Sequence, residues 1–447
     1  MATFFGISDW GDLLGLFRLL KSEGHTVQLH VKHPEAKDVG RGLVDLAKFP
    51  APPPGAIVIF DHAGAGTLGQ QLRAKGHPVI GGNPLDKELD LDRTKGTAHF
   101  TAAGIKTPDT HTFTSMAQGR AFLATHKGQW FWKPNGNLSC STTYNGKDAA
   151  QLARFLAWAE THIQGIKGFE LQKKVDGTEV SVEGWFDGTR FVPPFNSTIE
   201  DKKFLAGDLG PRTGCQTNVV WPWETDTLPE RTVARLEKTL KAAKYVGPID
   251  SNLIVDADGT PYGLEWSPRL GFDAIQALCC LLDPVGDQLE AFARGSLKEW
   301  SLKPGLALTV RMSTPPFPAE RDAITKKPRA TPLPVHGLPL DPKLCDTPGR
   351  IFVDDVMLGK DGQPALAGRD GNVCCVGLRG DEMVPLRKAL LKVVDGIDLP
   401  NRQYRRDLLP RFEEAVAHLK AHRYIREADV VNASRPKPNP GASSKAA

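Results

Sequence analysis

This 447-residue sequence lacks the cysteine spacing of a zinc site or of a disulfide framework. Its seven cysteines are an odd number and form no CxxC pair, and four of them stand as the adjacent pairs Cys279-Cys280 and Cys374-Cys375. A zinc ribbon and a small disulfide-stabilised fold are therefore not indicated, and reduced thiols favour a cytoplasmic protein.

Long apolar runs and a strong charge of one sign are also absent. No stretch approaches the roughly 20 apolar residues that span a membrane. The 56 Lys and Arg residues against 52 Asp and Glu residues leave a net charge of +4, which is too weak for the basic footprint of a nucleic-acid-binding protein. We expect neither membrane nor nucleic-acid partners, and the sequence leaves the oligomeric state open.

The first 95 residues alternate between predicted strands and helices. Strands are expected at 3–7, 26–31, 56–60 and 78–80, and Ser8 or Asp9 is expected to cap the first helix. This alternation is typical of a parallel sheet. GAGTLG at 64–69 matches a dinucleotide fingerprint in letter, but it does not follow the first strand. A turn that lines a small-substrate pocket is favoured over a nicotinamide site.

The middle of the chain predicts antiparallel β structure with helices packed on it, across residues 108–195. An aromatic strand, QWFWK, ends at Lys133 and runs into a loop rich in hydroxyl side chains. The following polar, glycine-punctuated stretch at 196–223 is too long for an ordinary connection, so we expect a functional loop there. A helix is expected at 229–245.

The stretch from 247 to 271 predicts a β-hairpin around Asp258-Gly259. Asp250 and Asn252 stand near the start of its first strand, and Glu265 ends the second, so their oxygen atoms would converge. Such ligands suit Mg²⁺, and the guanidinium group of Arg269 could meet a phosphate. The alternative is a surface hairpin with solvated charges.

From about residue 305 the pattern changes to that of a smaller α+β domain. A strand at 307–312, a proline-rich stretch at 314–350 and helices at 381–396 and 404–424 are expected. The Pro- and Ser-rich tail at 432–447 is expected to be disordered.

A strand-ending lysine, a glutamate-bearing strand–turn–strand and an acidic hairpin are together what a nucleoside triphosphate with Mg²⁺ requires. Their order resembles that of the ATP-grasp ligases, in particular the phosphoribosylamine–glycine ligases, over roughly residues 3–425. The stretches that carry the resemblance are GGNPLDKELDLDRTKGTAHFTAAGIKTP, FELQKKVDGTEVSVEGWFDGTRFVPP, EDKKFLAGDLGPRTG, VGPIDSNLIVDADGTPYGLEWSPRLG, and HGLPL followed by NVCCVGL.

The resemblance implies an ATP-grasp fold of the α/β and α+β class. Its domains would be an N-terminal Rossmann-like pre-ATP-grasp domain at 1–95, a subdomain with nucleotide lid and hinge at 96–195, a catalytic subdomain with the metal hairpin at 196–304, a C-terminal α+β domain at 305–431, and the tail. It also implies a ligase that joins a small carboxylate to an amine through an acyl phosphate, as in purine biosynthesis, with ATP and Mg²⁺ as cofactors.

The resemblance also implies roles for individual residues. Catalytic roles fall on Lys133, Lys203 and Arg269. Nucleotide binding falls on Lys95, Lys133, Gln172, Lys173, Val175 and Glu179. Substrate binding falls on Asp201, Lys203, Gly210, Pro211, Thr213, Gly214, Arg269 and Gly271. Arg212 stands where the family has asparagine and is a further candidate, because it could bind a substrate anion. Glu265 and Ser267 match metal positions of the family. Asp250 and Asn252 are further metal candidates because the predicted hairpin would bring them close to Glu265.

Several positions depart from the family pattern. The loop at 134–143 lacks the family's second lysine, Ser267 replaces an asparagine, and the first two βα turns read GISDWGD and DHAGAGT. The hinge begins Gln172-Lys173 in place of paired glutamates. We therefore expect a ligase with a diverged amine or acid. The alternatives are authentic glycinamide ribonucleotide synthesis and a catalytically impaired nucleotide-binding protein.

Overall fold

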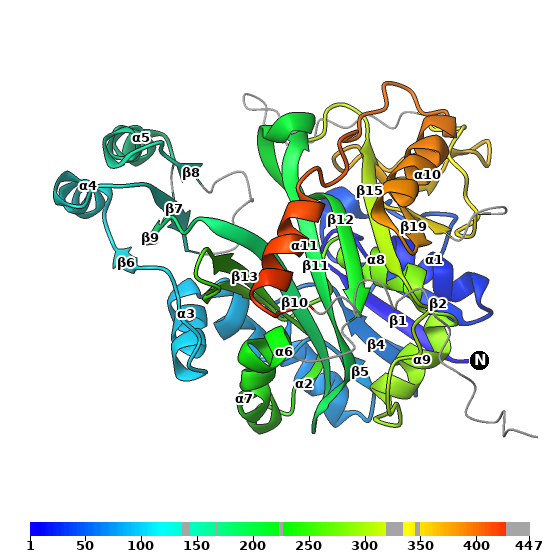
Figure 1. The fold of residues 1–447 in the computed structure, drawn as a ribbon. Coiled ribbons are helices and arrows are strands. Elements are labelled where there is room, and N and C mark those ends of the chain that lie inside the picture. Colours follow the sequence, from blue (N-terminus) through cyan, green and yellow to red (C-terminus); the bar gives the residue numbers. More distant parts are fainter. Residues whose placement is uncertain are drawn as a thin grey trace, which may run out of the picture.

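The computed structural model describes residues 1–135, 144–163, 165–166, 168–222, 227–318, 334–344 and 349–425. The predicted tail at 432–447 and most of the hydroxyl-rich loop after Lys133 lie outside these residues. Figure 1 displays two sheets in the main body and a smaller unit that projects from it. Among the described residues, no helix is long and apolar enough to cross a membrane.

The N-terminal part is a five-stranded parallel sheet in the order β3-β2-β1-β4-β5, as the alternating pattern predicted. Its elements are β1 (Thr3–Ser8), α1 (Leu14–Ser22), β2 (Thr26–Val31), β3 (Asp45–Leu46), β4 (Ile57–Phe60), α2 (Gly66–Ala74) and β5 (Val79–Ile80). Phe4 and Phe5 are both fully buried, in different apolar clusters, because both faces of the sheet are covered. The carboxyl ends of β1 and β4 meet at the point where the strand order reverses.

The predicted cap of the first helix is wrong. α1 begins at Leu14, and no side chain caps it. Ser8 instead accepts a hydrogen bond from the backbone N–H of Gly11 and donates one to Asp61. The polar side chains at the end of β1 therefore connect two βα turns and do not start a helix.

A four-stranded antiparallel sheet with two helices forms a separate unit, which we call the lid subdomain. The π-helix η2 (Lys87–Leu91) and α3 (Arg93–Ala102) lead to it, and it consists of β6 (Thr110–Phe113), α4 (Met116–Thr125), β7 (Trp130–Pro134), β8 (Tyr144–Asn145), α5 (Ala149–His162) and β9 (Phe169–Lys173). Its apolar side chains, including Trp130, Trp132 and Leu171, form a cluster apart from the main core. The antiparallel structure predicted across 108–195 is therefore divided between two sheets. The lid subdomain contains it up to about residue 173, and the rest belongs to the largest sheet.

The largest sheet has eight antiparallel strands in the order β14-β13-β10-β11-β12-β15-β19-β16. They are β10 (Gly177–Asp187), β11 (Phe191–Leu205), β12 (Leu209–Pro222), β13 (Val246–Asp256), β14 (Pro261–Ser267), β15 (Leu306–Ser313), β16 (Gly349–Val353) and β19 (Asn372–Gly380). The predicted hairpin at 247–271 is confirmed as β13 and β14.

The loop predicted at 196–223 is wrong, because β11 and β12 form a long hairpin there. The stretch is polar since many of its side chains line a cavity or bond to the C-terminal segment, so polarity does not mark a loop here. The single helix predicted at 229–245 is also wrong, because this segment forms three short helical elements. It divides into α6 (Thr227–Arg231), the 3₁₀ turn η5 (Val233–Leu236) and α7 (Glu237–Ala242).

The C-terminal segment does not stand apart from the rest. β15, β16 and β19 continue the sheet that holds the β13–β14 hairpin, and their buried side chains belong to the main apolar cluster. The remaining elements are α8 (Ala274–Leu281), α9 (Val285–Ala293), β17 (Val356–Leu358), β18 (Pro364–Leu366), α10 (Met383–Gly396) and α11 (Phe412–Ala421). In Figure 1, α11 lies across β10 and β11.

Candidate active site

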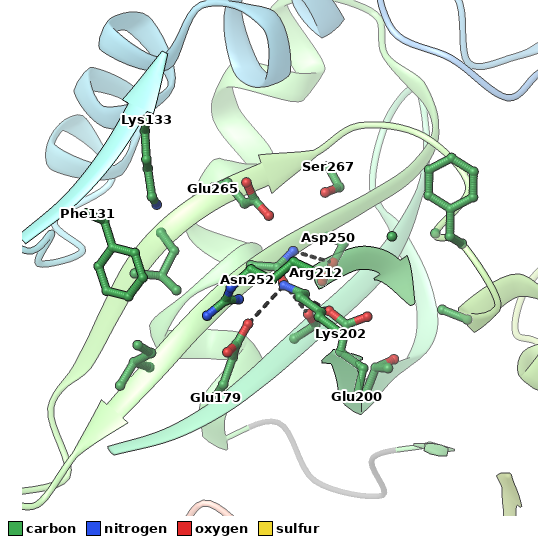
Figure 2. A pocket seen from close by; sticks show the side chains of 18 of the residues that line it. Phe131, Lys133, Glu179, Glu200, Lys202, Arg212, Asp250, Asn252, Glu265 and Ser267 are labelled. Carbon is green, nitrogen blue, oxygen red and sulfur yellow. Dashed lines mark hydrogen bonds and ion pairs between the residues drawn. The ribbon is translucent and has the colours of Figure 1, made fainter. Parts of the chain in front are cut away.

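A cavity of about 260 Å³ lies between the lid subdomain and the eight-stranded sheet. Its walls come from β7 and β9 of the lid, from β10 to β14 of the sheet, and from the loop that connects β14 to α8. Figure 2 shows Lys133 pointing from the lid toward the strands that carry Glu265 and Asn252. Segments more than a hundred residues apart in sequence therefore face one space.

Glu265 is the carboxylate about which the cations of this cavity gather. Arg93 Nη1 lies 3.7 Å from Glu265 Oε2. Burial acts to raise the pKa of Glu265, but the charges of Lys202, Arg93 and Lys133 outweigh it and lower the pKa to about 2. Glu265 is thus ionised at neutral pH, as a ligand for a divalent cation must be.

Lys202 lies between two further carboxylates. Its Nζ is 2.9 Å from Glu179 Oε1 and 3.1 Å from Glu200 Oε1. Burial alone would lower the pKa of Lys202, but Glu179 and Glu200 raise it well above its ordinary value. Lys202 in turn lowers the pKa of Glu179. A permanently charged ammonium group is therefore fixed on the floor of the cavity.

The other end of the cavity is formed by the hinge between the lid and the sheet. Lys133 Nζ donates a 2.7 Å hydrogen bond to Gln172 Oε1 on the neighbouring strand. Burial, aided by the charge of Arg93, lowers the pKa of Lys133 to about 8. Lys173 and Val175 continue this wall. A lysine next to polar and apolar hinge residues would suit a nucleotide whose base contacts the hinge and whose phosphates face Lys133.

The four residues predicted at the metal site all line the cavity and come together in register. Asn252 pairs with Glu265 across the hairpin, and Asp250 pairs with Ser267. Asn252 Nδ2 donates to Asp250 Oδ2 at 3.0 Å, while the buried Oδ1 of Asp250 has no hydrogen-bond partner. Burial raises the pKa of Asp250 well above its ordinary value, and the nearby Glu183 and Glu200 add to this.

Within the described ranges, no group of three or more His, Cys, Asp or Glu side chains is arranged as a metal site. Mg²⁺ is often held by one or two carboxylates together with substrate phosphates, so a complete protein cage is not needed. Glu265 is ionised, and Asp250 has an unpaired buried oxygen, although its raised pKa means that it would have to lose a proton to bind a cation. This donor set fits a magnesium ion that arrives with a nucleotide.

Most of the predicted nucleotide and substrate residues line the same cavity. These are Lys133, Gln172, Lys173, Val175, Glu179, Arg212, Thr213, Gly214, Arg269 and Gly271. Arg269 Nε is 3.2 Å from Asp90 Oδ2, and its guanidinium group lies over the ring of Phe272.

Five predicted residues do not line the cavity. Gly210 and Pro211 are exposed at the far part of the β11–β12 hairpin. Lys95 pairs with Glu88 at 3.1 Å on the outside of α3, and Lys203 Nζ donates to the carbonyl oxygen of Gly210. Asp201 is buried, accepts from Thr217 and from the backbone of Leu409, and pairs with Arg405. Asp201 therefore ties the hairpin to the C-terminal segment.

Sequence reasoning missed four charged residues that line the cavity: Arg93, Glu183, Glu200 and Lys202. A signal for two of them was available. Side chains alternate between the faces of a strand, so Glu200 and Lys202 share a face that Asp201 and Lys203 do not. The alternation identifies these two residues only when 196–223 is taken as strand, and the predicted loop hides it.

The chain is similar to known proteins in sequence and in fold. No protein-family model matches the chain. The phosphoribosylamine–glycine ligase of Leifsonia xyli is 26% identical over 353 residues, which are 76% of this chain and 80% of that protein. The enzyme of the same name from Ralstonia nicotianae is 25% identical over 356 residues, 75% of this chain and 79% of its own length.

Solved structures give the same fold. The phosphoribosylamine–glycine ligase of Thermotoga maritima has a TM-score of 0.67 at 18% identity, covering 91% of this chain and 100% of its own. A biotin carboxylase domain from Hydrogenobacter thermophilus, in complex with MgADP and bicarbonate, has a TM-score of 0.60 at 12% identity, covering 92% of this chain and 98% of its own. The predicted fold class is thus confirmed. The chain has the ATP-grasp fold, and the sequence relatives that it matches are named as ligases.

Proposed function

We propose that this protein is an ATP- and Mg²⁺-dependent ligase that joins a carboxylate to an amine, and that its amine or acid differs from phosphoribosylamine and glycine. The observation that carries the proposal is the ionised Glu265 facing Lys202, Arg93 and Lys133 in one cavity. Four charged groups from four segments would meet a triphosphate and its metal ion there. ATP would supply the phosphoryl group that converts the carboxylate into an acyl phosphate, and the amine would displace that phosphate.

The residues of the chain have separate tasks in this proposal. Gln172 and Val175 receive the base in the hinge, and Lys133 neutralises charge on the phosphates from the lid side. Lys202 acts from the sheet side, where Glu179 and Glu200 hold its ammonium group in place. Fixed charges aimed at the transferred group are the main means by which phosphoryl transfer is accelerated.

Divergence of the amine is supported by the first βα turn. A turn that binds phosphate needs free backbone N–H groups. The N–H of Asp9 donates to Asp61 Oδ1 at 3.2 Å, and the N–H of Gly11 donates to Ser8 Oγ at 2.7 Å. Both N–H groups therefore donate to side chains of the protein itself. The carboxyl groups of Asp9 and Asp61 at this turn would also disfavour an anion.

Two cations lie beside this turn, and both are engaged. Lys32 Nζ lies 3.0 Å from Asp9 Oδ1. The guanidinium group of Arg369 is buried and pairs with three carboxylates, those of Asp12 at 2.8 Å, Asp354 at 3.1 Å and Asp370 at 3.2 Å. Phosphoribosylamine carries a phosphate that would need such a cation. A non-phosphorylated amine fits this edge of the sheet better.

Two alternatives have specific support. The names of the sequence relatives favour authentic phosphoribosylamine–glycine ligation. Ser267, a weak neutral ligand at a predicted metal position, favours a nucleotide-binding protein with impaired catalysis.

The test separates the acid from the amine. Purified protein is incubated with MgATP, hydroxylamine and a panel of carboxylic and amino acids, because hydroxylamine captures acyl phosphates as coloured hydroxamates. An acid that gives hydroxamate together with ADP identifies the first substrate, and the Glu265→Gln variant serves as the inactive control. MgATP binding without acid-dependent ADP release from any mixture would instead support the impaired protein.

Authentic glycinamide ribonucleotide synthesis has its own test. The gene is expressed in a purine-auxotrophic strain that lacks this ligase. We expect no growth without purines. Growth would establish the purine-pathway pair of substrates and refute a diverged amine.

A further inference from the structure

The positive charges that line the cavity are unequally neutralised by the protein itself. Lys202 lies within 3.1 Å of two carboxylates, Arg93 faces Glu265, and Arg269 pairs with Asp90. Among the described residues, Arg212 is a cavity-lining arginine with no carboxylate within ion-pairing distance. Its charge is therefore available to an anion that enters.

The position of Arg212 indicates which anion that is. Its guanidinium carbon lies 6.0 Å from the ring centroid of Phe131, on the lid strand two residues before Lys133. Figure 2 shows Arg212 extending across the cavity toward Phe131. A guanidinium group held over the face of an aromatic ring at this distance keeps its N–H donors free, and those donors match phosphate oxygens. Arg212 thus faces the nucleotide end of the cavity, opposite Lys133.

We propose that Arg212 is a nucleotide-binding residue that contacts the β- and γ-phosphates of ATP from the sheet side, while Lys133 contacts them from the lid side. The inference rests on the proposed function, since it needs ATP in this cavity. It differs from the substrate-binding role that the sequence suggested for Arg212. It also explains how the chain gathers enough positive charge when residues 134–143 contain no lysine.

The contact between Arg212 and Phe131 has a second consequence, which concerns the lid subdomain. Phe131 belongs to the lid subdomain and Arg212 to β12, so the pair bridges the two walls of the cavity. A phosphate bound to Arg212 would draw the lid wall and the sheet wall onto the same ligand. Nucleotide binding should therefore order the lid more when the γ-phosphate is present.

The test compares nucleotides that differ only in their phosphates. Affinities of the full chain for MgATP, MgADP and AMP are measured by calorimetry for the wild type, Arg212→Met and Arg212→Lys. Arg294→Met, which removes an exposed arginine paired with Glu290 on α9, is the matched control. Melting temperatures of all variants establish that each is folded.

We expect Arg212→Met to weaken MgATP binding about tenfold to a hundredfold, as for a lost charge-assisted hydrogen bond, and to leave AMP binding within about twofold. Arg212→Lys should retain part of the affinity, and Arg294→Met should match the wild type. Equal weakening of AMP and MgATP would overturn the inference. So would unchanged MgATP binding, even if the KM for an acid or amine substrate rose. Failure of the wild type to bind any nucleotide would remove the proposed function and the inference together.

Discussion

Replacement of Lys202 by methionine tests the centre of the site most directly. Methionine keeps most of the length of the side chain but removes the ammonium group between Glu179 and Glu200. Two effects follow, one on stability and one on catalysis, and the structure allows them to be separated. The first arises because two carboxylates lose their shared cation, and the second because the transferred phosphoryl group loses a fixed positive charge.

The size of the stability effect can be estimated from the two contacts. At 2.9 and 3.1 Å, and with an effective dielectric constant of about 20, each contact is worth about 5 kcal/mol of gross attraction. Desolvation of the ammonium group offsets much of this, and removal of one partner of a buried pair typically costs about 3 kcal/mol or more. The side chains of Lys202 and Glu200 are 21% and 16% exposed, so this pair carries most of the cost, whereas Glu179 is 42% exposed and its contact is screened by solvent. We therefore expect a loss of about 3 kcal/mol.

The assay combines urea denaturation with turnover. Lys202→Met should unfold at a lower urea concentration, and its kcat should fall about 100-fold to 1000-fold, as when one preorganised donor is lost. The double variant Lys202→Met/Glu200→Gln removes one of the two uncompensated charges. It should recover most of the stability and none of the activity. Lys202→Arg is the charge-conserving control.

Two outcomes would refute this reasoning. If the double variant stays as unstable as Lys202→Met, the cost does not arise from uncompensated carboxylates. If Lys202→Met keeps wild-type kcat with the acid that gives hydroxamate, the ammonium group does not act on the transferred phosphoryl group.

Three further predictions concern other parts of the molecule. Burial lowers the pKa of Lys133 to about 8, so the affinity for MgATP measured by calorimetry should fall between pH 7 and pH 9, and Lys133→Arg should abolish that fall. Burial raises the pKa of Asp86 from 3.8 to about 7, so the folded state binds the extra proton and loses stability as pH rises between these values. In denaturant titrations, the advantage of Asp86→Asn over the wild type should grow across that window by up to about 4 kcal/mol. Arg311→Lys removes the bidentate pair in which Arg311 donates to Asp273 at 2.7 and 3.2 Å, and it should lower the free energy of unfolding by about 2 kcal/mol in the same titrations. It should also lower kcat, because Asp273 anchors the loop before α8.

The N-terminal sheet and the β13–β14 hairpin could be predicted because their signals are local. Short apolar strands alternating with helices leave a parallel sheet as the favoured arrangement, and Asp258-Gly259 marks a hairpin by its turn alone. Local patterns of this kind can be recognised in a single sequence. The turn does not by itself place the metal candidates, because a β-bulge beside Leu253 shifts the register by one residue and so brings Asn252 opposite Glu265.

The cavity floor could not be predicted in the same way. β11 and β12 read as a loop because their polar side chains are satisfied by partners far away in sequence, as Asp201 is by Arg405. The choice of Lys202 over Lys203 needed the strand assignment first. Arg93 reaches Glu265 from the start of a helix 172 positions earlier, and no spacing rule connects such segments.

The shared sheet has a consequence for how the protein can be divided. All strands that carry the predicted metal residues precede residue 305, so a chain cut there would retain them. Yet β12 gives its outer edge to β15, from Thr217 opposite Val310 to Val220 opposite Ala307. Such a fragment would leave a row of unbonded amide and carbonyl groups beside an uncovered apolar surface, and bare edges of this kind recruit strands from other molecules. The strands after residue 305 thus protect the edge of the sheet that carries these residues.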